Sequence, residues 1–318
     1  MGAESRGGRL LGPGIGRRDA LKVGLGLALA GHRGPRALWA QEPQRTRPIP
    51  SSGEHVPVMG LGSARTFSDR WGRVERDSLR QVLRLFHAGG GRVFDTAPTY
   101  GGAETVSGRL AQELGIHRDL FFATKISTGG GAEAGRAQDR GSRDAWARET
   151  IDLSQVHNLR GVEIHLPTLR EAKAAGRVRY VGITTSRIPQ HDATEAVLAR
   201  EEMDFVQLNY SLGERQAAER LLPLAQGRGV GVVVNEPFNG GRLFAAVRGG
   251  GVPEWASEFD CHSWGQFFLK YILGHPAVTV VIPATGDPEH LVDNMGAGRG
   301  ALPDESQRRR MESYFDGL

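Results

Sequence analysis

The sequence predicts an α/β fold, a (β/α)₈ TIM barrel in a single domain. Two observations support this: eight short runs are rich in β-branched and aromatic residues, and longer amphipathic stretches separate them. Alternation of this kind indicates repeated βα units around a parallel sheet. Eight such units close a barrel of about 250 residues. The chain has 318 residues, which is enough for one barrel and an amino-terminal leader.

The eight predicted strands follow one another at spacings that leave room for a helix between most of them. They are residues 56–62, 92–97, 120–126, 151–157, 178–185, 204–211, 229–236 and 278–285. Two of the stretches between them, residues 75–89 and 263–275, place apolar residues three and four positions apart. This periodicity predicts helices that pack one face against the barrel.

One helix of the ring is predicted to be weak. Residues 129–150 contain few apolar residues and have Gly141 in their middle. A helix there has little core face to bury, and an interior glycine costs it about 1 kcal/mol relative to alanine. Longer connections at 235–262 and 284–300 follow the last two strands, where such barrels carry ligand-binding loops.

Residues 1–40 are predicted to be an export leader that precedes a barrel domain at residues 41–318. Arg17 and Arg18 precede the apolar run 23–31, and the leader ends at Ala40. The run is too short for an ordinary transmembrane helix, so no stable membrane span is expected. The segment resembles a twin-arginine signal, which implies the twin-arginine export machinery as a partner and a periplasmic location. If the leader does not function, it is a basic tail on a cytoplasmic protein.

The charge distribution argues against a nucleic-acid partner. The formal net charge is +4, but residues 1–40 alone carry +5, so the remaining chain carries −1. A barrel without a basic surplus lacks the electrostatic footprint of a nucleic-acid binder. Cys261 is the only cysteine, which excludes an intrachain disulfide and zinc sites built on cysteine pairs. No histidine pair has metal-ligand spacing, and no metal is predicted.

Four side chains of different chemistry follow consecutive predicted strands. Asp95 follows the second strand, Tyr100 lies in the loop after it, Lys125 follows the third strand and His157 the fourth. Active sites of TIM barrels lie at the carboxyl ends of the strands, and neighbouring strands are about 4.8 Å apart. We therefore expect these four side chains to converge.

The four residues suit the reduction of a carbonyl group. This reaction needs a proton donor beside the oxygen on which negative charge develops, and Tyr100 is the candidate general acid. Lys125 supplies a cation to bring the pKa of the phenol towards working pH. Asp95 holds that ammonium in place, and His157 orients the carbonyl. Only 4 of the 40 basic residues are lysines, and the compact ammonium suits this tuning role.

These motifs resemble the aldo-keto reductase family over roughly residues 46–312. Further similar stretches are IPSSGEHVPVMGLG, LPTLREAKAAGRVRYVGITTS, DFVQLNYS and TVVIPATGDPEHLVDN. The resemblance implies catalysis by Asp95, Tyr100, Lys125 and His157, a small carbonyl or alcohol as substrate, and NADP (or NAD) as cofactor. The cofactor-binding residues that it implies are Thr184, Thr185, Gln207, Asn235, Phe238, Thr285, His290 and Asn294.

Two departures from the family pattern concern the cofactor. Asn235 stands where many relatives have a tyrosine that stacks on the nicotinamide ring, so stacking requires Phe238 or another aromatic residue. Ala284 and His290 stand where relatives that prefer NADP carry basic residues. A site without arginine should bind a 2′-phosphate more weakly, so the choice between NADP and NAD stays open.

Three other functions have some support in the sequence. An exported cofactor-binding barrel could act as a sensor or assembly partner with little turnover. The same four residues also allow alcohol oxidation. A glycosidase is suggested only by Glu236 in an NEP motif, which has no second carboxylate at the end of the fourth strand.

Overall fold

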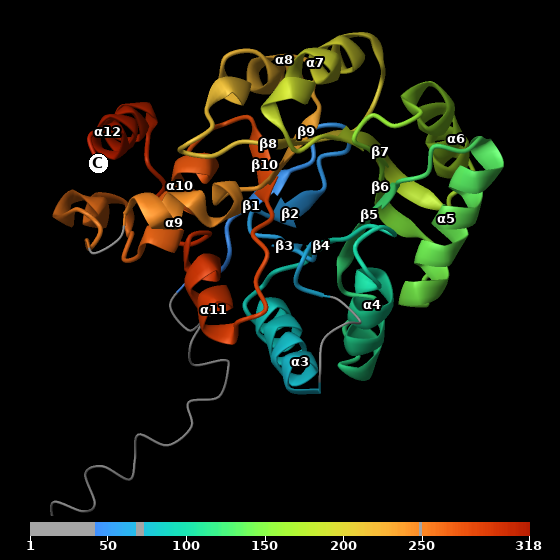
Figure 1. The fold of residues 1–318 in the computed structure, drawn as a ribbon, viewed down its shortest axis with the longest axis horizontal. Coiled ribbons are helices and arrows are strands. Elements are labelled where there is room, and N and C mark those ends of the chain that lie inside the picture. The colour runs from blue at the N-terminus through green and yellow to red at the C-terminus, as the bar shows by residue number, and fades with distance from the viewer. Residues whose placement is uncertain (1–41, 68–72, 248–249) are drawn as a thin grey trace, which may run out of the picture. The chain divides into compact units, whose positions relative to one another are not determined.

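Eight parallel strands form the centre of the structure (Figure 1). Each pairs with the next along the chain, and parallel bridges from Met59 to Val281 and from Gly62 to Ala284 join the first to the last. The sheet therefore closes, which confirms the predicted (β/α)₈ barrel. The strands are β3 (Leu61–Gly62), β4 (Val93–Asp95), β5 (Phe121–Ile126), β6 (Ile151–His157), β7 (Val178–Thr184), β8 (Phe205–Asn209), β9 (Gly231–Asn235) and β10 (Val278–Val281).

This structure is a computed structural model that describes residues 42–67, 73–247 and 250–318. Residues Gln41–Leu318 form one compact unit. The predicted export leader, residues 1–40, lies outside the described residues. Within the described ranges, no helix is both long enough and apolar enough to cross a membrane.

A ring of helices surrounds the barrel (Figure 1). The ring helices are α3 (Arg73–Ala88), α4 (Ala103–Glu113), α5 (Ala132–Trp146), α6 (Val162–Ala174), α7 (His191–Arg200), α8 (Leu221–Gly227), α10 (Trp264–Leu273) and α11 (Pro288–Gly296). Short helices lie in the connections: η1 (Ile188–Gln190), η2 (Gln216–Ala218), η3 (Asn239–Gly241), α9 (Arg242–Ala246) and η4 (Glu254–Phe259). The connection from β9 to α10 is long, as the sequence predicted, whereas most of the second predicted long connection, residues 284–300, is occupied by α11.

A hairpin fills the amino-terminal end of the barrel. It consists of β1 (Thr46–Pro48) and β2 (His55–Pro57), which pair antiparallel. Ile49 and Val56 from this hairpin share one buried cluster with residues near the starts of the barrel strands, including Phe121 and Phe205. The first predicted strand, residues 56–62, is therefore divided between the hairpin and β3.

The barrel interior changes from apolar to polar along the strands. Side chains two positions apart point to the same face of a strand. On β5, Phe121 and Ala123 belong to the apolar cluster and Lys125 follows them; on β8, Phe205 is succeeded by Gln207. The apolar cluster therefore lies towards the hairpin, and the polar side chains lie at the carboxyl ends.

The helix between β5 and β6 is continuous, although the sequence predicted a weak one. α5 spans 15 residues and ends at Trp146, whose side chain is fully buried. The indole stacks on Phe122 with 4.3 Å between ring centroids and also contacts Phe94. The helix also buries polar Ser142, which donates a 2.8 Å hydrogen bond to Glu104 of α4. One large aromatic anchor and polar contacts replace the apolar stripe that the prediction required.

The final helix, α12 (Glu305–Asp316), is fixed at both its start and its buried face. Asp304 and Gln307 form a reciprocal capping box at its start. Arg308 reaches the barrel, where Nη2 donates to Oη of Tyr210, directly after β8, at 2.6 Å and Nε donates to the carbonyl of Tyr271 on α10 at 3.2 Å. The carboxyl-terminal tail is thereby part of the folded unit.

Candidate active site

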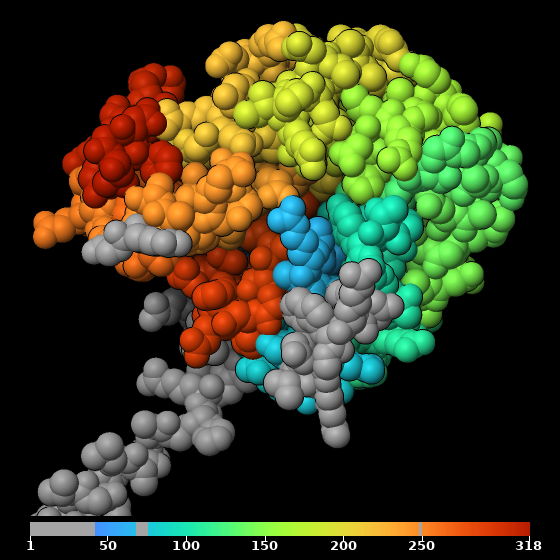
Figure 2. Space-filling model, in the orientation of Figure 1, coloured from blue at the N-terminus to red at the C-terminus, as the bar shows by residue number. Residues whose placement is uncertain are grey.

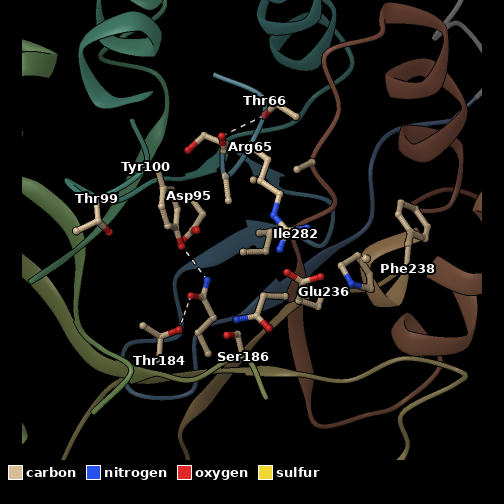
Figure 3. Close-up of a pocket in the computed structure, with 18 of the residues that line it drawn as sticks. Arg65, Thr66, Asp95, Thr99, Tyr100, Thr184, Ser186, Glu236, Phe238 and Ile282 are labelled. Atoms are coloured by element: carbon tan, nitrogen blue, oxygen red, sulfur yellow. Dashed lines mark hydrogen bonds between the residues drawn. The ribbon is translucent and has the colours of Figure 1, made fainter. Parts of the chain in front are cut away.

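A cavity of about 920 Å³ opens at the carboxyl ends of the barrel strands. The residues around it come from loops far apart in the sequence (Figure 3). On the face shown in Figure 2, the chain after β3 (blue) lies at the surface between the segment after β9 (orange) and the segment after β4 (teal). Seven of the site residues predicted from the sequence line the cavity: Asp95, Tyr100, His157, Thr184, Gln207, Asn235 and Phe238.

Lys125 and Asp95 form a buried ion pair beneath the cavity. Lys125 Nζ lies 2.7 Å from Asp95 Oδ2, and the two side chains are only 1% and 5% exposed. Nζ also donates to the Thr96 carbonyl at 2.7 Å. Burial is the largest single influence and favours loss of the lysine proton, but the charge and hydrogen bond of Asp95 together with the contributions of Tyr100 outweigh it, so the pKa of Lys125 is raised. The ammonium therefore stays charged at neutral pH.

A chain of hydrogen bonds holds the other oxygen of Asp95. Gln207 Nε2 donates to Asp95 Oδ1 at 2.9 Å, and Thr184 Oγ1 donates to Gln207 Oε1 at 2.6 Å. Figure 3 shows this chain running from Thr184 to Asp95. With one oxygen held by Lys125 and the other by Gln207, the carboxylate has a fixed orientation.

Tyr100 lies beside this pair, at the wall of the cavity (Figure 3). Lys125 Nζ is 5.0 Å from the centroid of the Tyr100 ring. Burial raises the pKa of the phenol; the charge of Lys125 acts in the opposite direction but does not outweigh it. Lys125 does lower the pKa of Tyr100, as the sequence predicted, but burial raises it by more, so the pKa of Tyr100 is above its ordinary value. At neutral pH the phenol carries its proton.

His157 approaches Tyr100 from the end of β6. The two rings meet edge to face, with 5.8 Å between centroids. Burial, followed by the charges of Lys125 and Arg160, lowers the pKa of His157 to about 4. The imidazole is therefore neutral at neutral pH. Ser127 Oγ lies 2.7 Å from its Nδ1.

Several residues of the cavity were not identified as functional from the sequence. Arg65 and Phe244 line it, and so does Glu236, whose negative charge contributes to the raised pKa of Tyr100. Three non-glycine residues of the lining have left-handed backbones, with φ of 67° at Arg65, 53° at Asn158 and 47° at Glu236. Such strain gathers at functional sites, but the amino-acid sequence does not reveal it.

A second cavity of about 480 Å³ adjoins the first and shares Arg65, Ser186, Glu236 and Gly240 with it. Its lining has three arginines, Arg65, Arg187 and Arg242, against two glutamates. Arg242 is paired with Glu214 at 3.1 Å. This side of the site therefore has a small excess of positive charge.

Asn235, at the end of β9, and Phe238, which follows it, also line the cavity. Asn235 Nδ2 donates to the Thr185 carbonyl at 2.8 Å, while its Oδ1 is buried and has no partner among the described residues. Phe238 packs against Phe244, with 4.9 Å between ring centroids. The site thus offers one free amide acceptor and an aromatic pair.

Four of the eight cofactor-binding residues implied by the family pattern lie outside this cavity lining. Thr185 is buried and contacts Thr194 through a hydroxyl pair at 3.1 Å. Thr285 accepts a hydrogen bond from Asp287 N at 3.0 Å, and Asn294 is buried on α11. The side chain of His290 is 75% exposed. All except Thr185 belong to the segment after β10.

Comparison with known proteins identifies the family. Residues 58–313 match the profile of the aldo/keto reductase family. The chain belongs to the aldo/keto reductase family. Among its curated relatives is the aldo-keto reductase YhdN of Bacillus subtilis, 28% identical over 192 residues, which are 56% of this chain and 57% of YhdN. Another is L-galactose dehydrogenase of Arabidopsis thaliana, 25% identical over 286 residues, which are 79% of this chain and 87% of that protein.

Solved structures of this family have the same fold. An aldo-keto reductase from Klebsiella pneumoniae in complex with NADPH superposes with a TM-score of 0.72 at 21% identity, covering 86% of this chain and 96% of the other. The holo form of aldo-keto reductase AKR11C1 from Bacillus halodurans gives 0.68 at 23% identity with the same coverage. Both likenesses concern the barrel fold.

Proposed function

We propose that this aldo-keto reductase family member is an NAD(P)-dependent oxidoreductase that reduces an aldehyde or ketone, or oxidises the corresponding alcohol. One observation carries the proposal: a buried Lys125–Asp95 pair, 2.7 Å apart, stands beside Tyr100 at the wall of the cavity. A buried ion pair is costly to maintain for stability alone, whereas a fixed cation beside a phenol is useful in proton transfer.

The cavity fits a nicotinamide cofactor. Asn235 Oδ1 is a buried acceptor without a partner among the described residues, and Phe238 with Phe244 offers apolar faces. Thr184, Gln207, Asn235 and Phe238 would hold the nicotinamide end, and the arginines of the adjoining cavity suit negatively charged groups. When bound, the cofactor supplies or accepts the hydride.

For the adenosine end, the family pattern implies Thr285, His290 and Asn294. For the carboxamide of the nicotinamide, it implies Thr185 beside Thr184 and Gln207. NADP is the first choice by family habit, and NAD is the alternative. Neither Ala284 nor His290 provides a permanent positive charge for a 2′-phosphate.

Each catalytic side chain has a role that follows from its surroundings. Tyr100 is protonated at neutral pH and would donate that proton to the oxygen of the carbonyl as negative charge develops there. Lys125 stays charged and would stabilise the resulting phenolate. Asp95 holds Lys125 in place, and neutral His157 would donate a hydrogen bond to the same oxygen. In alcohol oxidation the proton moves in the reverse direction.

The test is binding and turnover measured on the same protein. For the protein of residues 41–318, titration with NADPH or NADH should quench the intrinsic protein fluorescence. When simple aldehydes are added, the protein should oxidise NADPH or NADH. Tyr100→Phe should keep binding and lose nearly all turnover. If neither cofactor binds, the proposal is wrong.

The second candidate is a cofactor-binding barrel with a sensor or partner role and little turnover. The raised pKa of Tyr100 favours it, because a phenol that holds its proton tightly is a reluctant acid. Tight binding of NADPH with no turnover of any aldehyde, and no effect of Tyr100→Phe, would support this candidate over the enzyme.

We also propose that residues 1–40 are a twin-arginine export leader and that residues 41–318 are the periplasmic protein. The paired Arg17 and Arg18 before an apolar run support this. Amino-terminal sequencing of the protein recovered from the periplasm should begin at Gln41. Retention of the whole chain in the cytoplasm, unchanged by Arg17→Lys with Arg18→Lys, would contradict it.

A further inference from the structure

One nitrogen of the His157 ring has a fixed partner outside the cavity. Ser127 Oγ lies 2.7 Å from His157 Nδ1. Ser127 follows Lys125 by two residues, directly after β5, and its side chain is buried. The ring itself lines the cavity beside Tyr100, and no hydrogen bond within the described ranges engages its other nitrogen, Nε2.

The backbone at Ser127 is held from two sides. Gln138 of α5 accepts hydrogen bonds through Oε1 from Ser127 N at 2.8 Å and from Thr128 N at 3.0 Å. Arg160, in the turn after β6, donates through Nη1 to the Ser127 carbonyl at 3.4 Å. The hydroxyl therefore has a defined position relative to His157, set by α5 and by the turn that follows the histidine.

The direction of the Ser127–His157 hydrogen bond depends on the tautomer of the ring, and the surroundings of the hydroxyl favour donation from Ser127. A serine hydroxyl has one proton to donate, and His157 Nδ1 is the acceptor that the described part of the chain provides for it. Because the imidazole is neutral, one of its nitrogens carries a proton and the other accepts. If Ser127 donates to Nδ1, the ring proton must be on Nε2.

We propose that Ser127 is a positioning residue that keeps His157 in its Nε2–H tautomer. The consequence for catalysis rests on the proposed function: Nε2–H and the Tyr100 hydroxyl then present two donors to one carbonyl oxygen. With the opposite tautomer, the lone pair of Nε2 would face that oxygen and repel it. The tautomer itself is a property of the free protein and does not depend on any substrate.

The tautomer can be read directly by NMR. In the protein labelled with ¹⁵N at histidine, two-bond correlations between ring nitrogens and carbon-bound protons distinguish the two tautomers, and His157→Gln identifies the signals of His157. We expect the Nε2–H pattern at pH 7 in the unaltered protein. Ser127→Ala should shift His157 to a mixture of tautomers, and Ser127→Thr, which keeps a hydroxyl, should restore the original pattern.

Ser154→Ala is the matched control. Ser154 is also a buried serine, on β6 itself, but its hydroxyl has no hydrogen-bond partner among the described residues. Its removal should leave the His157 signals unchanged. An Nδ1–H pattern in the unaltered protein, or a His157 spectrum that Ser127→Ala leaves unchanged, would overturn the proposal.

Kinetics separate this inference from the proposed function. If the protein reduces aldehydes, Ser127→Ala should lower kcat by about tenfold, the effect of losing one oriented hydrogen bond, with little change in KM for NADPH. A full rate in Ser127→Ala would overturn the positioning role. If the unaltered protein reduces no carbonyl, the proposed function fails, while the NMR result still decides whether Ser127 sets the tautomer.

Discussion

At the scale of single residues, Tyr100 lies under two opposing influences on its pKa. Burial disfavours the phenolate, and the ammonium of Lys125 favours it. Because burial is the larger effect, the pKa of Tyr100 in the free protein lies above the ordinary pKa of tyrosine. Tyr100 therefore carries the proton that carbonyl reduction needs but gives it up reluctantly, and the phenolate that alcohol oxidation needs is scarcely populated at neutral pH.

This arrangement predicts different pH dependences for the two directions of reaction. For aldehyde reduction, kcat/KM should be constant between pH 7 and 9, because Tyr100 stays protonated. For alcohol oxidation, log kcat/KM should rise with pH over the same range, because the fraction of phenolate increases. Initial rates measured in one buffer series would check this. A reduction rate that declines from pH 7 to 9 would show that Tyr100 titrates at a lower pKa.

At the scale of elements, α5 contains two glycines with opposite surroundings. A Cβ at Gly135 would lie 2.8 Å from His165 Nδ1, closer than the packing permits, whereas a Cβ at Gly141 would meet no atom within 4 Å. Gly135 thus allows α5 to approach α6, and Gly141 has no such role.

Alanine substitutions should therefore change stability in opposite directions. Gly141→Ala should raise the free energy of unfolding by about 0.5–1 kcal/mol through helix propensity alone. Gly135→Ala should lower it by about 1–3 kcal/mol because His165 must move. Urea denaturation of the two variants provides the comparison, and equal effects would mean that α5 does not pack as described.

Some features of the barrel and of the site could be predicted from the sequence, and others could not. The eight strands and the convergence of Asp95, Tyr100 and His157 follow from local patterns, because strand alternation and the common active-site edge of a barrel are general rules. The hydrogen bonds from Gln138 to the backbone at Ser127 depend on how α5 packs, and composition alone suggested that this helix would be weak. Trp146 was the missed signal, since one buried indole anchors the helix.

At the scale of the whole molecule, Arg308 joins the carboxyl-terminal helix to the barrel. It is 8% exposed and donates to Tyr210 and to the Tyr271 carbonyl. Arg308→Ala should leave these groups unsatisfied and lower the free energy of unfolding by about 2–4 kcal/mol. Arg309→Ala is the control: its side chain is 65% exposed and pairs with Glu305, so a change below about 0.5 kcal/mol is expected. Similar losses in both variants would contradict an anchoring role.

Acid should destabilise the whole fold through two partly buried histidines. The pKa values of His157 and His275 are each lowered to about 4, chiefly by burial, whereas an unfolded histidine titrates near pH 6.5. The unfolded chain therefore binds protons first, so the free energy of unfolding should fall as the pH decreases from about 6.5 to about 4.

His275→Gln should make that decline shallower, because one of the two histidines with a lowered pKa no longer titrates. Urea denaturation at pH 7.5, 6 and 5 would measure the slope in both proteins. An unchanged slope would show that His275 titrates alike in the folded and unfolded chains.

The burial of lysine has a chemical consequence for the barrel surface. Lys125 and Lys270 are almost completely buried, which leaves Lys173, with 41% of its side chain exposed, as the one accessible lysine amine in the described ranges. Primary amines condense with simple aldehydes to form imines, and guanidinium groups do so far less readily. A surface that relies on arginine for its positive charge therefore exposes few amine nucleophiles, which would limit imine formation with the aldehydes proposed as substrates.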